Sequence, residues 1–262
     1  MPVAAKTADP ALAARARAFD AAVFERGARE VRRAPGGKAL RHPGLPRVLD
    51  LNAVQLEATL DADAVERLAD ELLEGLGHRR VVVEDEAHAT RLEPALTARG
   101  WAAERLLLLA RDGGQPPPDA PFPAEEVPYG HVRGLRAEWL RSEPWADGEE
   151  LMRQVLEADG LLFTATRTRA FAAFEAGRPL SYALLLLDGR DGMLEDVYTT
   201  PEARGRGLAT SVIAAVLHAA RGERCEAVFV PTEHDGRARA LYERLGFAPA
   251  AVVHRFQRWV RA

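Results

Sequence analysis

A strand, a glycine-rich turn and a helix follow one another over residues 192–220, and this succession limits the possible folds more than any other stretch. The extended run 192–200 enters the turn, and residues 201–210 read PEARGRGLAT. Apolar residues then recur with a period near 3.6, which predicts an amphipathic helix: Leu208, Val212, Ile213, Val216, Leu217 and Ala220. Such a turn directs several backbone N–H groups at one point, and the helix dipole adds partial positive charge there. The stretch therefore predicts an anion cradle suited to phosphate, where glycine lets the backbone approach the ligand.

The composition excludes several classes of protein. The chain has 262 residues, and at ~100–200 residues per domain this length suggests one large domain or two small ones. A net charge of −4 argues against a general nucleic-acid binder. The single cysteine, Cys225, allows no internal disulfide and fits a reducing cytoplasm. Since no apolar run approaches ~18 residues and no signal peptide is recognisable, we expect a cytoplasmic protein without a membrane partner.

The hydrophobic pattern predicts two successive sets of elements. In the first set we expect a helix at 10–24, a hairpin at 29–41, a strand at 48–56, a helix at 61–76, a strand at 81–83, a helix at 89–99 and a strand at 101–111. Five of the seventeen prolines then lie within 112–123, which indicates a linker. In the second set we expect helices at 131–141 and 148–158, a hairpin at 168–187, the strand, turn and helix described above, a strand at 227–230, a helix at 236–245 and a strand at 252–260. The predicted domains are 1–112 and 124–262, joined by the linker 113–123.

The second set resembles the GNAT superfamily, the acetyl-CoA-dependent N-acyltransferases. Residues 204–209 (RGRGLA) match that superfamily's Arg/Gln-x-x-Gly-x-Gly/Ala pyrophosphate loop. Residues 238–247 (ARALYERLGF) are similar to its A-x-x-L-Y-x-x-x-G-F signature. The resemblance covers residues 124–262 and implies an α/β (α+β) GNAT fold, with a mixed central sheet flanked by helices.

The first half repeats this order of elements weakly. Where a glycine loop belongs, residues 54–62 read VQLEATLDA, with no glycine and two acids that would repel phosphate. We infer a degenerate GNAT-like half that holds no cofactor, as in tandem GNAT proteins. An unrelated α/β accessory domain is the alternative.

The resemblance also implies a site for acetyl-CoA. In the family, the strand before the glycine loop separates from the next strand, and the pantetheine arm lies between them. The backbone N–H of Val197 would then serve the thioester oxygen. Asp235 stands where the family often has Asn, and an ionised carboxylate cannot donate a hydrogen bond. The implied cofactor-binding residues are Val197, Tyr198, Thr199, Arg204, Gly205, Arg206, Gly207, Leu208, Ala209, Thr210, Asp235 and Ala238.

Two side chains are candidate catalytic residues. Tyr242 occupies the family's general-acid position, where a phenol reaches the coenzyme sulfur; the alternative role is a core anchor. An alkyl ammonium has a pKa of ~10.4, so a base or a water must take its proton. Strand alternation places Asp191, Glu195 and Val197 on one face and Asp196 and Tyr198 on the other. The family's base precedes the Val197 position by an even number of residues, which favours Glu195, then Asp191, over Asp196; a solvated or ion-paired carboxylate is the alternative for each.

These features predict an N-acetyltransferase that moves an acetyl group from acetyl-CoA to a primary amine by direct attack in a ternary complex, without a metal. The acceptor would be a small-molecule amine or a peptide amine, bound by residues of the variable segment 130–162, to which the first half could add part of the cleft. No nucleic-acid partner is expected, and the chain would be a monomer or a homodimer. The alternative is a GNAT fold that binds or senses acyl-CoA without turnover.

Overall fold

The computed structural model describes residues 9–234 and 236–260. The elements of the first half are α1 (Pro10–Gly27), β1 (Glu30–Ala34), β2 (Gly37–Arg41), β3 (Ala53–Leu56), α2 (Ala62–Leu72), β4 (His78–Val83), α3 (Glu86–Ala98) and β5 (Ala102–Asp112). The elements of the second half are β6 (Glu125–Val127), α4 (Arg133–Ser142), α5 (Glu149–Ala165), β7 (Arg167–Glu175), β8 (Arg178–Asp188), β9 (Asp191–Thr199), α6 (Leu208–Gly222), β10 (Ala227–Glu233), α7 (Arg237–Arg244) and β11 (Ala248–Trp259).

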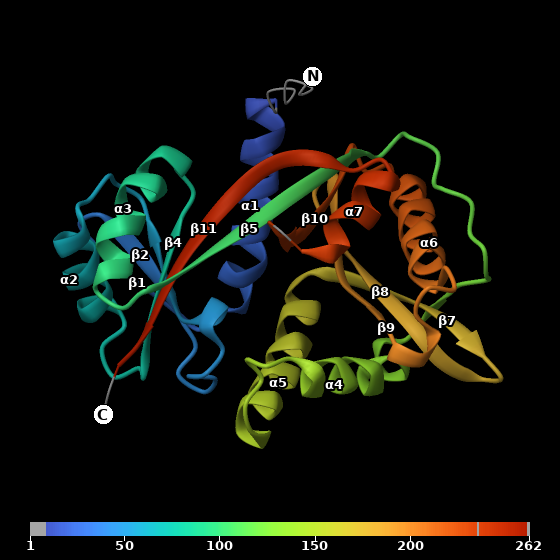
Figure 1. Cartoon of the computed structure of the whole chain (residues 1–262), viewed down its shortest axis with the longest axis horizontal. Helices are drawn as coiled ribbons and strands as arrows, with labels where there is room; N and C mark the ends of the chain where they lie inside the picture. The colour runs from blue at the N-terminus through green and yellow to red at the C-terminus, as the bar shows by residue number, and fades with distance from the viewer. Residues whose placement is uncertain (1–8, 235, 261–262) are drawn as a thin grey trace.

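One mixed sheet joins the eleven described strands in the order β1-β2-β3-β4-β11-β5-β10-β9-β8-β7-β6 (Figure 1). The pairs β3–β4 and β9–β10 are parallel, and each is connected by a helix, α2 and α6 respectively. The unit β3-α2-β4 therefore repeats β9-α6-β10, and the predicted mixed α/β GNAT-like fold is confirmed.

The two halves exchange their last strands. β5, the last strand of the first half, pairs antiparallel with β10 from Asp112 opposite Ala227 to Leu106 opposite Glu233. β11, the last strand of the second half, pairs antiparallel with β4 and with β5. In Figure 1 these two long strands run side by side through the middle of the molecule. The sequence did not predict this exchange, and whether the two halves behave as separate domains stays a prediction.

Helices cover both faces of the second-half strands. α6 packs on one face, where its apolar stripe joins side chains of β8, β9 and β10 in a buried cluster. α1 and α4 pack on the opposite face, against alternate residues of the same strands. A further core in the first half lies between α2, α3 and the sheet, and it includes Phe256 of β11.

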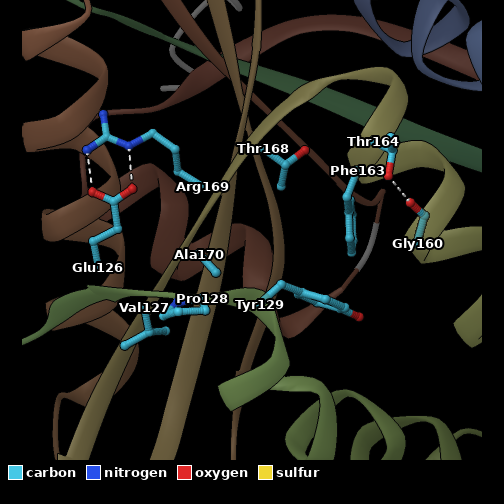
Figure 2. Close-up of a pocket in the computed structure, with 10 residues that line it drawn as sticks. All are labelled: Glu126, Val127, Pro128, Tyr129, Gly160, Phe163, Thr164, Thr168, Arg169 and Ala170. Atoms are coloured by element: carbon cyan, nitrogen blue, oxygen red, sulfur yellow. Dashed lines mark hydrogen bonds and ion pairs between the residues drawn. The ribbon is translucent and has the colours of Figure 1, made fainter.

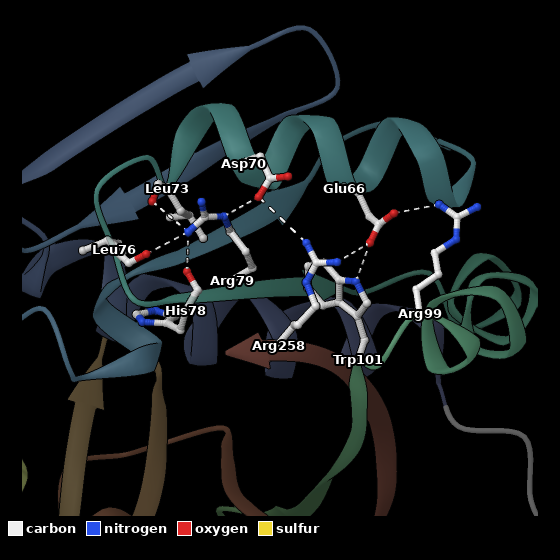
Figure 3. Close-up of polar contacts among 9 residues, drawn as sticks. All are labelled: Glu66, Asp70, Leu73, Leu76, His78, Arg79, Arg99, Trp101 and Arg258. Carbon is white, nitrogen blue, oxygen red and sulfur yellow. Dashed lines mark hydrogen bonds and ion pairs between the residues drawn. The ribbon is translucent and has the colours of Figure 1, made fainter. Parts of the chain in front are cut away.

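Polar contacts also tie the exchanged strands to α2 (Figure 3). Glu66 of α2 accepts hydrogen bonds from the Trp101 indole (2.9 Å) and from the guanidinium of Arg258 in β11 (2.7 Å). Arg79 of β4 donates to three backbone carbonyls around the end of α2 and to Asp70. Glu66 and Arg258 are far apart in the sequence, so their hydrogen bond ties β11 into the first half.

The main departures from the predicted elements have local causes. β6 was not predicted because it is only three residues long. α5 runs to Ala165, beyond the predicted end at 158, and β11 begins at Ala248 because a bulge between Pro249 and Ala251 accommodates the proline. No helix in the described ranges is long and apolar enough to cross a membrane.

Candidate functional site

β9 and β10 separate after their first three residues. They are paired only from Asp191 opposite Ala227 to Met193 opposite Phe229. Beyond this point β9 continues along β8, as far as Thr199, while β10 continues along β5. The separation that the resemblance implied is therefore present, and it opens toward the turn that leads into α6.

A β-bulge in β9 corrects the predicted alternation of side chains. Glu195 lies opposite Leu184 and Tyr198 lies opposite Tyr182, so β9 has one residue more than β8 between these pairs. Asp196, at the bulge, has a positive φ of 53°. As a result, Val197 packs on the α6 side of the sheet, while Tyr198 packs on the α1 and α4 side together with Met193. The prediction that Val197 shares a face with Glu195, and that Tyr198 does not, is wrong.

The glycine turn leaves a set of backbone donors free. Gly205 and Gly207 both have positive φ, 75° and 95°, and Gly207 caps the start of α6. The first N–H groups of a helix have no partner within it. In the described part of the chain, no acceptor is found for the backbone N–H groups of five residues: Gly205, Gly207, Leu208, Ala209 and Thr210; the N–H of Arg206 closes the turn over residues 204 and 205. This donor set and the helix dipole suit a diphosphate group.

The two glycines have different surroundings. A Cβ at Gly205 would meet no atom within 4 Å, so its side toward solvent is open. A Cβ at Gly207 would lie 3.0 Å from Pro121, a residue of the proline-rich linker. The linker is held there because the backbone N–H of Phe122 donates to Ser211 Oγ of α6 (3.0 Å). Gly207 therefore allows the linker to pack beside the turn.

Both arginines of the turn have protein partners. Arg206 forms an ion pair with Glu175 at the end of β7. The Nε of Arg204 donates to the backbone carbonyl of Thr199 (3.1 Å), and its guanidinium lies 6.0 Å from the centre of the Tyr198 ring. Their positive charges remain near the turn even though their donors are partly used.

Tyr242 is buried and lies within electrostatic range of Glu195. Burial raises the pKa of Tyr242 above its usual range, and the nearby Glu195 and Asp196 carboxylates add to the effect. Tyr242 is 6% exposed and packs edge-on against Phe247, with ring centroids 5.9 Å apart. No described residue is hydrogen-bonded to its hydroxyl.

The Glu195 side chain is half-buried, and within the described residues it has no hydrogen bond or ion pair. Burial raises the pKa of its carboxyl well above the usual range, and the carboxylates of Asp196 and Asp20 raise it further. Such a carboxyl is poised to accept a proton closer to neutral pH than an ordinary glutamate.

The other two acidic candidates are engaged. Asp191 lies where β9 and β10 are still paired, and it forms an ion pair with Arg15 of α1. Asp196 accepts a hydrogen bond from Arg136 Nη1 (2.9 Å), and burial raises its pKa to about 6. Arg136 also binds Asp159 of α5 through Nε and Nη2 (2.8 and 3.0 Å). Sequence reasoning missed Arg136; its place among the buried residues of an amphipathic helix was the only signal.

One predicted cofactor residue belongs to α7: Ala238 is exposed in the first turn of that helix. Asp235 lies outside the described residues.

A separate hollow of about 640 Å³ lies at the edge of the sheet, between β6, β7 and the end of α5 (Figure 2). Its walls include the Tyr129 and Phe163 rings, which meet edge to face with centroids 4.7 Å apart. An ion pair between Arg169 and Glu126 borders it on another side. None of the predicted site residues lines this hollow.

Comparison with known proteins identifies the family and the fold. The family model described as the acetyltransferase (GNAT) family matches residues 132–247. Among solved structures, a functionally unknown conserved protein from Staphylococcus epidermidis aligns with a TM-score of 0.70 at 11% identity, over 89% of this chain and 95% of the other. A GCN5-related N-acetyltransferase from Kribbella flavida aligns with a TM-score of 0.65 at 18% identity, over 94% and 95%. A tandem GNAT protein from the clavulanic acid biosynthesis pathway aligns with a TM-score of 0.53 at 15% identity, over 88% and 82%.

No significant match was found among curated protein sequences. At these identities the solved structures establish a shared fold, which extends over most of the chain. The second half of the chain is a domain of the GNAT superfamily, as its two motifs predicted.

Proposed function

We propose that the protein is an N-acetyltransferase that transfers an acetyl group from acetyl-CoA to a primary amine by direct attack in a ternary complex. The observation that carries this proposal is the set of five free backbone N–H groups, those of Gly205 and of residues 207–210, which follow the strand β9 where it separates from β10. The Glu195 carboxylate lies close enough to Tyr242 to raise the pKa of its hydroxyl. These features support a site in which the diphosphate is bound at the turn and the reacting group lies near Glu195 and Tyr242.

The residues present fit acetyl-CoA, which would supply an activated acetyl thioester. The free N–H groups of Gly205 and of residues 207–210 would hold its diphosphate, with the side chains of Arg204 and Arg206 adding positive charge. The backbone from Val197 to Thr199 would border the pantetheine arm, and Ala238 lies at the start of α7. Among the described residues, neither Asp196 nor Val197 has a partner in the ladder with β8, which supports Val197 as a backbone donor to the thioester oxygen.

The two candidate catalytic side chains would have opposite roles in proton transfer. Glu195 in its ionised form would accept the proton that the amine must lose, and its raised pKa makes that form more basic but restricts it to higher pH. Tyr242, whose pKa is also raised, stays protonated at neutral pH and would donate to the departing sulfur. The proposed reaction uses no metal.

The test combines a binding measurement with a turnover assay. Titration calorimetry with CoA measures binding, and release of free thiol from acetyl-CoA is followed over a panel of small-molecule amines and peptides. We expect CoA binding and amine-dependent thiol release, with the amide product detected by mass spectrometry. Absence of CoA binding would refute the site. Binding without turnover on any amine would favour the alternative, an acyl-CoA-binding module.

A further inference from the structure

We propose that Arg136 is a positioning residue that stabilises the bulge of β9, in the conformation needed for catalysis, through its ion pair with Asp196. This inference rests on the proposed acetyltransferase function, and it adds a residue that neither of the two sequence motifs contains. Arg136 acts through Asp196 and the backbone of Val197, and it lies in α4, outside both motifs.

The bulge contains a backbone conformation that needs support. Asp196 has a φ of 53°, in the left-handed region where a Cβ crowds the backbone. Glycine adopts this region without strain, and aspartate adopts it more readily than most residues. A residue other than glycine keeps such a conformation when surrounding contacts hold it there.

Arg136 provides those contacts with its whole guanidinium. Nη1 donates to Asp196 (2.9 Å), while Nε and Nη2 donate to the two carboxylate oxygens of Asp159. Arg136 and Asp159 are only 7% and 5% exposed, and the guanidinium lies 4.5 Å from the centre of the Trp139 ring. Because the planar fork is fixed on several sides, it cannot rotate away from Asp196 without leaving buried carboxylates unpaired.

The bulge determines how the side chain and the backbone N–H of Val197 are oriented. Its extra residue turns Val197 to the α6 side and takes it out of the ladder with β8. A regular strand would place Val197 on the same face as Glu195 and return its backbone to regular pairing. Loss of the grip on Asp196 would therefore disturb the proposed oxyanion donor, although Arg136 lies in another element.

Two substitutions of Asp196 distinguish a role in stabilising the backbone conformation of the bulge from a chemical role of the carboxylate. Asp196→Gly and Asp196→Ala both delete the carboxylate, but only glycine accepts the left-handed conformation freely. We expect Asp196→Gly to keep kcat within a few-fold of wild type, and Asp196→Ala to lose about 10²-fold, the scale of one lost oxyanion donor. The KM for acetyl-CoA should change little in either variant. Asp196→Gly should also have the higher Tm, by about 2–4 °C.

A double-variant comparison tests the part played by Arg136. Arg136→Lys should lower kcat in the wild-type background, because one ammonium cannot replace the three donors of the fork. In the Asp196→Gly background the same change should add little further loss, since the bulge there no longer depends on the arginine. Fully additive losses in kcat would show that Arg136 acts by another route and would overturn the proposal.

Two other results would overturn it as well. Equal kcat losses in Asp196→Gly and Asp196→Ala, with a shifted acidic limb of the pH–rate profile, would make Asp196 a proton acceptor instead. Wild-type kcat in both variants would mean that the bulge needs no support. If the wild-type protein neither binds CoA nor acetylates amines, the proposed function fails separately; the support of the bulge is then judged by Tm alone, and equal Tm values for the two variants refute it.

Discussion

At the scale of single residues, the ring and the hydroxyl of Tyr242 have separate roles, so removing the hydroxyl oxygen alone tests its proposed catalytic role. Its ring belongs to the buried cluster under α6 and α7, in edge contact with Phe247, whereas its hydroxyl has no partner among the described residues. Core burial and a general-acid role are therefore compatible in this residue. The ring accounts for the first role, and only the hydroxyl serves the second.

We expect Tyr242→Phe to lower kcat by roughly 10²-fold, since a placed proton donor typically contributes ~10²–10⁴-fold. CoA affinity and Tm should change little, because phenylalanine keeps the ring and its contacts. Steady-state kinetics with a reactive amine, under conditions where chemistry limits the rate, measure the effect. The control is Tyr198→Phe, whose hydroxyl donates to Glu138 of α4 (3.0 Å), and its effect should be milder. A Tyr242→Phe protein with wild-type kcat would reduce Tyr242 to a core anchor.

The raised pKa of Glu195 fixes the direction of a pH effect. Below that pKa the carboxyl is protonated and cannot accept a proton, so the wild-type rate should fall as the pH drops through it. Glu195→Gln keeps the shape of the side chain but cannot titrate, so we expect a rate lower by ~10²-fold or more and an acidic limb that has flattened. The pH–rate profiles of both proteins with one amine test this. Asp191→Asn, at the paired end of β9, serves as the control; if it alone flattened the limb, the base would be Asp191.

The sequence predicted which residues border the opening better than it predicted where they point. Glu195, Val197 and Tyr198 were all expected near the end of this strand, and they lie there. The faces of Val197 and Tyr198 were wrong because alternation assumes a regular strand. The bulge that breaks it accompanies an ion pair between residues 60 positions apart, Arg136 and Asp196, and no local pattern reports such a contact.

At the scale of elements, α6 and α2 occupy equivalent places but differ at their N-termini. α6 begins after a glycine turn with free N–H groups. α2 begins at its cap residue Asp61, whose carboxylate accepts a hydrogen bond from the Ala64 N–H (2.8 Å), with Asp63 adding negative charge in the first turn. The end of α2 is therefore already occupied by an anion from its own chain.

This difference predicts one CoA per chain. Titration calorimetry should give a single site, because α6 offers unoccupied backbone donors to a diphosphate and its counterpart α2 does not. Two equivalent sites would contradict the view that the first half is degenerate with respect to the cofactor.

Two substitutions of Gly205 with the same size and different charge test whether the glycine turn binds the diphosphate. Gly205→Asn and Gly205→Asp have nearly the same size, both residues tolerate positive φ, and a side chain at this position starts into open space. The aspartate adds a negative charge near the proposed diphosphate site, so we expect its CoA affinity to be at least ~10-fold weaker than that of the asparagine variant. Calorimetry on the pair measures the difference. Equal affinities would place the diphosphate elsewhere.

At the scale of the whole molecule, the exchanged strands make the first half depend on the end of the second. Phe256 of β11 is fully buried in the core between α2, α3 and the sheet. The linear pattern predicted most helices and strands because each is locally periodic. It could not predict the exchange, since either last strand, β5 or β11, is apolar enough to fit either gap in the sheet.

We therefore expect Phe256→Ala, a change in the last strand of the chain, to destabilise the fold by about 3–5 kcal/mol through the core of the first half. Amide hydrogen exchange should increase first in α2 and α3, whose core loses the ring. Trp259→Ala, on the same strand but at a side chain 60% exposed, is the matched control and should change stability much less. If hydrogen exchange in α2 and α3 did not change, β11 would not be needed for the first half.

The exchange also has a consequence for how the protein is made. A ribosome releases β4 and β5 early, but the gap between them is filled only when residues 248–259 have emerged. Until then β4 and β5 each have a strand edge without its final neighbour, and unpaired edges are templates for association with other chains. Synthesis that stalls between residues 113 and 247 would leave both edges exposed on the nascent chain. For this protein the demand for chaperones should therefore be set by the time needed to translate the second half.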